Sequence, residues 1–228
     1  TFLSFNNNRL SGSLPAALGK LTNLQGFRFD NNQLTGPIPA ELARLTLLTG
    51  NRALEGSGNL LSGPVPAAVL VMCHQRSGGP PPCRFTGQGV HPAGLRLPSE
   101  DLGALAGWAE FELGNNQGFH LKGSIPPSWG SLTALEQLNL WSNHLRGPIP
   151  PELGKLSALT SLYLPGSGGG IENKFSGSIP EELASLSLLE ILHLGGNLLT
   201  GSIPDVLGRL TKIRELVLGS NLLTGCVP

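Results

Sequence analysis

The sequence predicts an α/β solenoid in which each repeat contributes one short parallel β-strand and one short helical segment. A tetrad of Gly, any residue, an apolar residue and Pro recurs eight times, and most steps between the prolines are 24 residues. Apolar residues recur at fixed places before each tetrad, as L-x-x-L-x-L followed by an asparagine. Because a single repeat of this kind cannot bury its apolar face, the repeats have to stack on one another.

The composition excludes several other classes of protein. The 228 residues include 32 Gly and 19 Pro, too many for a helix bundle. Hydrophobic residues make up 39% and charged residues 13%, whereas a disordered chain has few apolar residues and a high net charge. Fifteen basic and fifteen acidic residues cancel, so nothing predicts binding to nucleic acid or to an anionic membrane. The longest apolar run, residues 66–72, is too short for direct insertion into a membrane.

Each position of the repeat has a physical role. In L-x-L the side chains alternate, so we expect Leu138 and Leu140 to point inward while Asn139 and Trp141 point outward. The glycine allows a sharp turn, and the proline fixes φ where a short helical segment begins, as at Pro180. The asparagine turns the chain inward, and its amide can bond main-chain groups that leave the strand. The asparagines of this column are Asn8, Asn32, Asn59, Asn116, Asn143, Asn173, Asn197 and Asn221.

The full pattern, L-x-x-L-x-L-x-x-N-x-L-[ST]-G-x-I-P, resembles the leucine-rich repeat, specifically its 24-residue plant-type subclass. The resemblance covers nearly the whole chain and is weakest over residues 67–98. It implies a right-handed solenoid with a concave parallel β-sheet and short helical or 3-10 segments on the convex side. We expect residues 1–228 to form a single domain of about nine repeats, a fragment of a longer chain. Residues 67–98 are interpreted as a degenerate repeat that carries an insertion.

Two cysteines flank this insertion. Cys73 and Cys83 can close the small loop as a disulfide, or they can remain as two reduced thiols. No metal site is predicted, because neither C-x-x-C nor H-x-x-x-H spacing is present. The insertion, and a smaller glycine-rich one at residues 166–171, can shape a binding surface or can be a neutral loop expansion.

No catalytic site is predicted. The glycine-rich residues 166–170 lack the Lys-Ser/Thr pair that a phosphate-binding loop requires, and no G-x-S-x-G motif occurs. Adjacent carboxylates such as Glu181 and Glu182 lie where a helical segment begins, and there they complement its N-terminus. We therefore expect a protein that is not an enzyme and that carries no cofactor.

The outward strand positions form the candidate binding surface. Counting back from each asparagine places Trp141, Tyr163 and His193 on three adjacent repeats. Exposed aromatic side chains on a rigid face suit a protein, peptide or glycan partner. The candidate partner-binding residues are Trp141, Tyr163, His193, Asn139, Glu112, Arg28, Asp30 and Glu55.

The resemblance implies a recognition module. Plant-type leucine-rich repeats form the ectodomains of receptor-like kinases and receptor-like proteins, and polygalacturonase inhibitors, which bind partners on the concave face. The alternative is a structural scaffold subunit in a larger assembly, without a free ligand. Receptor-like relatives favour an extracellular or cell-surface location. The absence of any N-x-[ST] glycosylation sequon weakens that expectation and keeps an intracellular location open, as in algal and protist relatives.

Overall fold

The computed structural model describes residues 1–48, 53–74, 83–84, 95–99, 102–106, 110–112, 120–166 and 172–226. The chain divides into two compact units. Unit 1 comprises Thr1–Ala104 and Asn116–Leu121, and unit 2 comprises Leu105–Asn115 and Lys122–Pro228. Each unit is described by itself below, and the expectation of a single domain stays a prediction.

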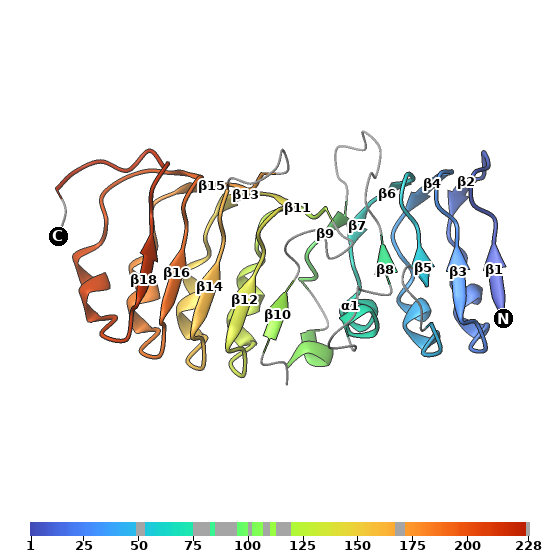
Figure 1. Cartoon of the computed structure of the whole chain (residues 1–228), viewed down its shortest axis with the longest axis horizontal. Helices are drawn as coiled ribbons and strands as arrows, with labels where there is room; N and C mark the ends of the chain where they lie inside the picture. The colour runs from blue at the N-terminus through green and yellow to red at the C-terminus, as the bar shows by residue number, and fades with distance from the viewer. Residues whose placement is uncertain are drawn as a thin grey trace. The chain divides into compact units, whose positions relative to one another are not determined.

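Unit 1 has a first sheet of parallel strands in the order β1-β3-β5-β8 and a second set of parallel strands, β2-β4-β6 and β7-β9 (Figure 1). Its described residues also form 3-10 helices and one α-helix. The first-sheet strands are β1 (Phe2–Ser4), β3 (Gly26–Arg28), β5 (Leu54–Glu55) and β8 (Cys83–Arg84). The second set comprises β2 (Ser11–Ser13), β4 (Gln33–Gly36), β6 (Leu60–Leu61), β7 (Gly63–Pro64) and β9 (Leu95–Arg96). The helices are η1 (Ala16–Lys20), η2 (Ala40–Arg44) and α1 (Ala67–His74).

Unit 2 repeats this plan more regularly. Its first sheet has the order β10-β12-β14-β16-β18, and its second sheet contains β11-β13-β15-β17, all parallel. The first-sheet strands are β10 (Glu110–Glu112), β12 (Gln137–Asn139), β14 (Ser161–Tyr163), β16 (Ile191–His193) and β18 (Glu215–Val217). The second-sheet strands are β11 (Lys122–Gly123), β13 (His144–Pro148), β15 (Lys174–Gly177) and β17 (Leu198–Leu199). The 3-10 helices are η4 (Pro127–Ser131), η5 (Pro151–Lys155), η6 (Glu181–Ser185) and η7 (Asp205–Arg209). A further one, η3 (Leu102–Leu105), has its first three residues in unit 1 and its last in unit 2.

The predicted alternation along the strands is confirmed. Leu138 and Leu140 are fully buried, whereas Asn139 and Trp141 between and after them are partly exposed. The same frame buries Leu162 and Leu192 on the next two first-sheet strands. Solenoid stacking therefore places one apolar layer of each coil against the next, and this shared core supports the outward side chains.

The asparagine column ties neighbouring coils together, as the sequence predicts. Asn197 Nδ2 donates to the carbonyl oxygens of Leu164 (2.8 Å) in the preceding coil and of Leu194 (3.0 Å) in its own. Its Oδ1 accepts from the main-chain N–H of Phe175 (3.0 Å). Each such side chain thus satisfies backbone groups of two coils that would otherwise be buried without partners. The same kind of bond to the preceding coil is made by Asn32, Asn59, Asn173 and Asn221, while Asn116 lies outside the described residues.

The Gly and Pro of each tetrad turn the chain. The eight tetrad glycines have φ between 76° and 94°, the left-handed region that residues with a Cβ rarely adopt. Pro180 precedes η6 with φ −64° and ψ 128°, and the other 3-10 helices that follow a tetrad proline begin in the same way. The turn chemistry therefore fixes where each coil leaves the second sheet and enters its helical segment.

The degenerate repeat keeps part of the frame. Helix α1 stands where other coils have a 3-10 helix, and Val69 and Leu70 on it are buried. Strand β8 pairs with β5 in the first sheet, and β9 pairs with β7 in the second. The residues 75–82 and 85–94 of this repeat lie outside the described residues, as do most of the glycine-rich residues 166–171.

Candidate functional site: the strand face

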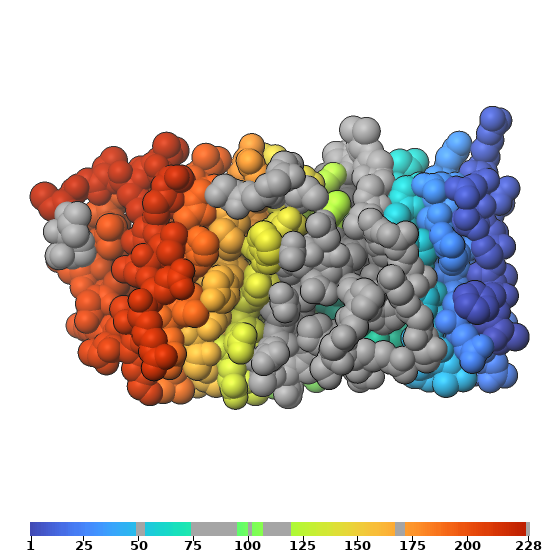
Figure 2. Space-filling model, in the orientation of Figure 1, coloured from blue at the N-terminus to red at the C-terminus, as the bar shows by residue number. Residues whose placement is uncertain are grey.

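The outward side of the first sheet, which we call the strand face, carries two rows of side chains in unit 2. The Cα register pairs Asn139 with Tyr163, Tyr163 with His193, and His193 with Val217. These four residues therefore form one continuous row across β12, β14, β16 and β18. The strands lie on the viewer's side of unit 2 in Figures 1 and 2, coloured from yellow to red. The second row, two residues earlier on each strand, consists of Gln137, Ser161, Ile191 and Glu215.

Tyr163 and His193 contact each other on this face. Their ring centroids are 6.2 Å apart at an interplanar angle of 66°, an edge-to-face arrangement. Both side chains are half-buried, so each ring is held in place while part of it remains available to a partner. Trp141 is also half-buried, and its main-chain N–H donates to Asn139 Oδ1 (3.2 Å). The structure thus brings four predicted site residues together within unit 2.

Residues with short side chains or none follow Trp141 at one outward position of the next coils. In the repeat frame, the positions that correspond to Trp141 in the next coils are Pro165, Gly195 and Gly219. A Cβ built on Gly195 would lie 3.1 Å from Val217 Cγ1 and 3.5 Å from His193 Nε2, whereas one built on Gly219 would meet no atom within 4 Å. The open space therefore lies over Gly219, one coil beyond His193. Sequence counting identified these positions, but it did not indicate that small residues adjoin the aromatic ones.

The strand face of unit 1 has a different character. Arg28 on β3 is in register with Glu55 on β5, and Arg28 Nε lies 3.4 Å from Asp30 Oδ1. Asp30 is only 6% exposed and Glu55 only 3% exposed. Both carboxylates are hence inaccessible in this structure, while the Arg28 side chain is 44% exposed. Their role in partner binding stays a prediction.

The last three predicted positions are described only in part. Glu112 on β10 is in register with Asn139, but its side chain lies outside the described residues. Cys73 is buried on α1 and is disulfide-bonded. The side chain of Cys83 also lies outside the described residues, so the pairing of these two cysteines stays a prediction. Cys226 is a free, exposed cysteine.

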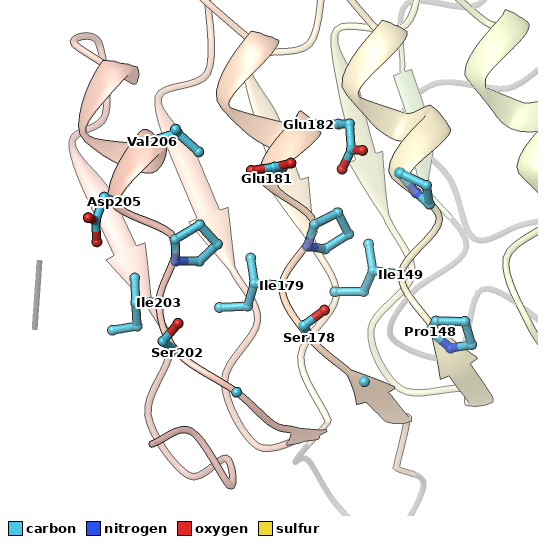
Figure 3. Close-up of a pocket in the computed structure, with 15 residues that line it drawn as sticks. Pro148, Ile149, Ser178, Ile179, Glu181, Glu182, Ser202, Ile203, Asp205 and Val206 are labelled. Carbon is cyan, nitrogen blue, oxygen red and sulfur yellow. The ribbon is translucent and has the colours of Figure 1, made fainter. Parts of the chain in front are cut away.

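Unit 2 also has a groove away from the first-sheet strands, which was not predicted from the sequence. It has a volume of about 970 Å³ and is lined by the tetrads of consecutive coils and the first residues of η6 and η7. Figure 3 shows Ile149, Ile179 and Ile203 along it, with the carboxylates of Glu181, Glu182 and Asp205 nearby. The periodic tetrad was the only signal available, and it was interpreted purely as a turn.

The comparison with protein families agrees with this architecture. A model described as Leucine Rich Repeat matches residues 1–21, 23–45, 134–156 and 188–210. The chain contains leucine-rich repeats. The matched segments cover the first two coils of unit 1 and two coils of unit 2, which include β12, β16 and the strand-face residues on them. No protein of curated function matches the chain.

Solved structures with the same fold include plant receptors. The leucine-rich repeat chain is similar to the plant peptide hormone receptor RGFR1 in complex with RGF2, with 28% identity and a TM-score of 0.59 over 100% of this chain and 33% of that chain. It is similar to a TDR receptor, with 31% identity and a TM-score of 0.58 over 100% of this chain and 36% of that chain. It thus spans about a third of the length of these two receptors.

A bacterial structure also matches. A leucine-rich repeat protein of Leptospira interrogans is 26% identical, with a TM-score of 0.55 over 97% of this chain and 49% of that chain. Together these neighbours confirm the solenoid of parallel strands and the resemblance to plant-type leucine-rich repeats. Among the described residues, no helix is long and apolar enough to span a membrane. The same residues hold no group of three or more His, Cys, Asp or Glu side chains suited to a metal ion.

Proposed function

We propose that this leucine-rich repeat chain is a recognition module that binds a protein or peptide on the strand face of unit 2. The observation that carries the proposal is the edge-to-face contact of Tyr163 and His193, with Trp141 on the neighbouring coil. Large aromatic side chains that are already ordered lose little conformational entropy on binding, and such residues contribute most of the affinity at protein interfaces.

The support beneath these side chains favours binding without rearrangement. Leu162 and Leu192, which alternate with Tyr163 and His193 along the chain, are fully buried. Because the inward leucines pack tightly, the outward rings sit on a rigid sheet. The open space at Gly219 lies one coil beyond His193 and can accept an extended main chain. These features suit a peptide segment that lies across the strands.

The solved neighbours support the same class of partner. RGFR1 was solved in complex with RGF2, and its description is a plant peptide hormone receptor. On this ground we propose a protein or peptide partner in preference to a neutral glycan for the strand face, and an extracellular or cell-surface location. No enzymatic activity is part of the proposal.

The test is capture of a partner by the immobilised chain, with a photo-reactive amino acid at Val217, which is in register with His193. Trp141→Ala with Tyr163→Ala should abolish cross-linking and leave the melting temperature nearly unchanged, because both side chains are partly exposed. Phe2→Ala, an aromatic residue that is 76% exposed in unit 1, is the matched control and should retain capture.

Two outcomes would contradict the proposal. Full capture by the double variant would exclude the strand face of unit 2 as the binding surface. Capture through a photo-reactive residue on the helical side of unit 2, with none through Val217, would favour the scaffold alternative.

A further inference from the structure

Four basic side chains gather on the second sheet of unit 2, away from the strand face. Lys122 on β11 is in register with His144 on β13, and Arg146 on β13 is in register with Lys174 on β15. All four alternate with buried residues such as Leu145 and so point to the solvent side. We call these four residues the basic patch. Its strands, β11, β13 and β15, lie side by side in Figure 1.

The charges in the basic patch are close enough to affect one another. Burial lowers the pKa of His144 below its ordinary value, and the positive charges of Lys122 and Arg146 lower it further. Arg146 and Lys174 are exposed, and no carboxylate of the described residues forms an ion pair with either of them. Glu172, also exposed, lies two residues before Lys174 and is the acidic residue nearest to it in the sequence. Arg146 and Lys174 therefore give the basic patch its excess of positive charge.

The surroundings of the basic patch are hydrophilic. Ser124 and Thr200 are exposed and Ser176 is half-buried on neighbouring coils. An exposed leucine, Leu198, is in register with Ser176 at the β17 edge of this surface. A protein interface usually has an apolar, fully desolvated centre, whereas the patch itself is centred on charged side chains. Stable binding to duplex nucleic acid or to an anionic membrane needs more fixed cations than the two lysines and one arginine here. A hydroxyl-rich ligand with spaced negative charges fits the surface better.

We propose that the basic patch binds an acidic polysaccharide whose carboxylate or sulfate groups pair with Lys122, Arg146 and Lys174. Adjacent parallel strands lie roughly 4.8 Å apart, and residues i and i+2 of one strand lie about 6.6 Å apart. A chain that crosses β11, β13 and β15 therefore meets a cation on each strand. Sugar hydroxyls can bond the neighbouring serine and threonine side chains. This site is separate from the strand face and can be occupied together with it.

His144 makes the binding depend on pH. An anionic ligand opposes the effect of Lys122 and Arg146 and so raises the pKa of His144 in the complex. Binding then takes up a proton, and by linkage the affinity increases as the pH falls below neutral. The charged groups that flank His144 are Lys122, Arg146, Lys174 and Glu172.

The test is calorimetry on the whole chain with three probes: an oligogalacturonate, a heparin oligosaccharide and a neutral cello-oligosaccharide. The first two probes distinguish carboxylate from sulfate recognition, and we expect at least one of them to bind while the neutral probe does not. R146A with K174A should weaken binding about tenfold and reduce the slope of log Kd against log salt by about 2. H144Q should remove the increase in affinity at low pH.

The matched control is R209A with K212A, which removes the same charge from exposed residues of unit 2 outside the basic patch. This variant, and the strand-face variant Trp141→Ala with Tyr163→Ala, should bind the acidic probe as the wild type does. The proposal is overturned if R146A with K174A binds the acidic probes unchanged or if the neutral probe binds equally well. Tighter binding of a poly-glutamate peptide than of either acidic probe would also overturn it and assign the patch to an acidic protein.

Discussion

The two units use one repeat frame to present two different surfaces. In unit 1 the outward positions of β3 and β5 carry Arg28 and Glu55, and the carboxylates of Glu55 and Asp30 are buried. In unit 2 the corresponding positions of β14 and β16 carry Tyr163 and His193, which remain half-exposed and contact each other. The inward positions of these four strands are fully buried: Phe27, Leu54, Leu162 and Leu192. The frame therefore determines the core, while the surface properties of each coil vary independently of it.

The cores themselves also differ in kind. Unit 1 contains a ring cluster in which Phe27 and Phe29 have centroids 4.8 Å apart, and Phe5 lies 5.6 Å from Phe27. Unit 2 fills the equivalent first-sheet positions with leucines such as Leu162 and Leu192. The inward positions are thus filled by phenylalanine in unit 1 and by leucine in unit 2. Cores tolerate such exchanges when the total side-chain volume and the spacing of the coils are kept.

The largest expected effect concerns these inward positions. Leu192→Ala removes a fully buried side chain and should lower the free energy of unfolding by about 2–5 kcal/mol, from lost burial and the cavity left behind. Leu216→Ala is the matched control, because this residue is in register with Leu192 but is 47% exposed. Denaturant unfolding measures both. A loss below about 0.5 kcal/mol for Leu192→Ala would mean that the strand register is wrong.

A smaller effect is expected where helical segments of neighbouring coils approach closely. A Cβ at Gly154 of η5 would collide with the main-chain carbonyl of Glu182, and one at Gly19 of unit 1 would collide with that of Glu41. Each Gly→Ala substitution should therefore cost about 1–3 kcal/mol in thermal or denaturant unfolding.

The control for this pair is Gly208 of η7, where a Cβ would meet no atom within 4 Å. Gly208→Ala should leave stability unchanged or raise it by about 0.5 kcal/mol, since alanine restricts the unfolded chain. Equal destabilisation at Gly154 and Gly208 would show that coil contact is not the cause.

The smallest expected changes in stability concern one ion pair in each unit. Arg28→Ala leaves the carboxylate of Asp30, whose side chain is 9% exposed, without its cation and should cost about 1 kcal/mol. Arg214→Ala breaks a pair with the same 3.4 Å separation but with side chains 78% and 37% exposed, and should cost less than about 0.5 kcal/mol. Unfolding of both variants at low and high salt measures the difference. An equal cost would contradict the distinction between the two faces.

Local periodicity was sufficient to predict most of the fold. Alternation predicted the burial of Leu138 and Leu140, and the need to satisfy backbone groups predicted the role of Asn197. Both follow from contacts that every coil repeats. The helix α1 was not predicted, because residues 67–74 depart from the repeat and their apolar run has no periodicity of its own.

The candidate site was less predictable for a related reason. Counting from the asparagines placed Tyr163 and His193 side by side, and the register confirms this. The same counting treated Asp30 and Glu55 as outward-facing residues, yet both are buried. Counting gives the side of the sheet on which a residue lies, but its accessibility depends on the side chains packed around it. The groove beside Ile179 and the close approach at Gly154 likewise depend on contacts between coils.

The asparagine column has a consequence for how unit 2 responds to load. Because Asn173 and Asn197 each bond main-chain atoms on both sides of a coil boundary, one coil cannot detach without breaking bonds of its neighbour. Unit 2 therefore resists separation of its coils at these boundaries as a connected stack. A pulling force applied at Tyr163 would therefore be shared by the hydrogen bonds of the adjacent coils.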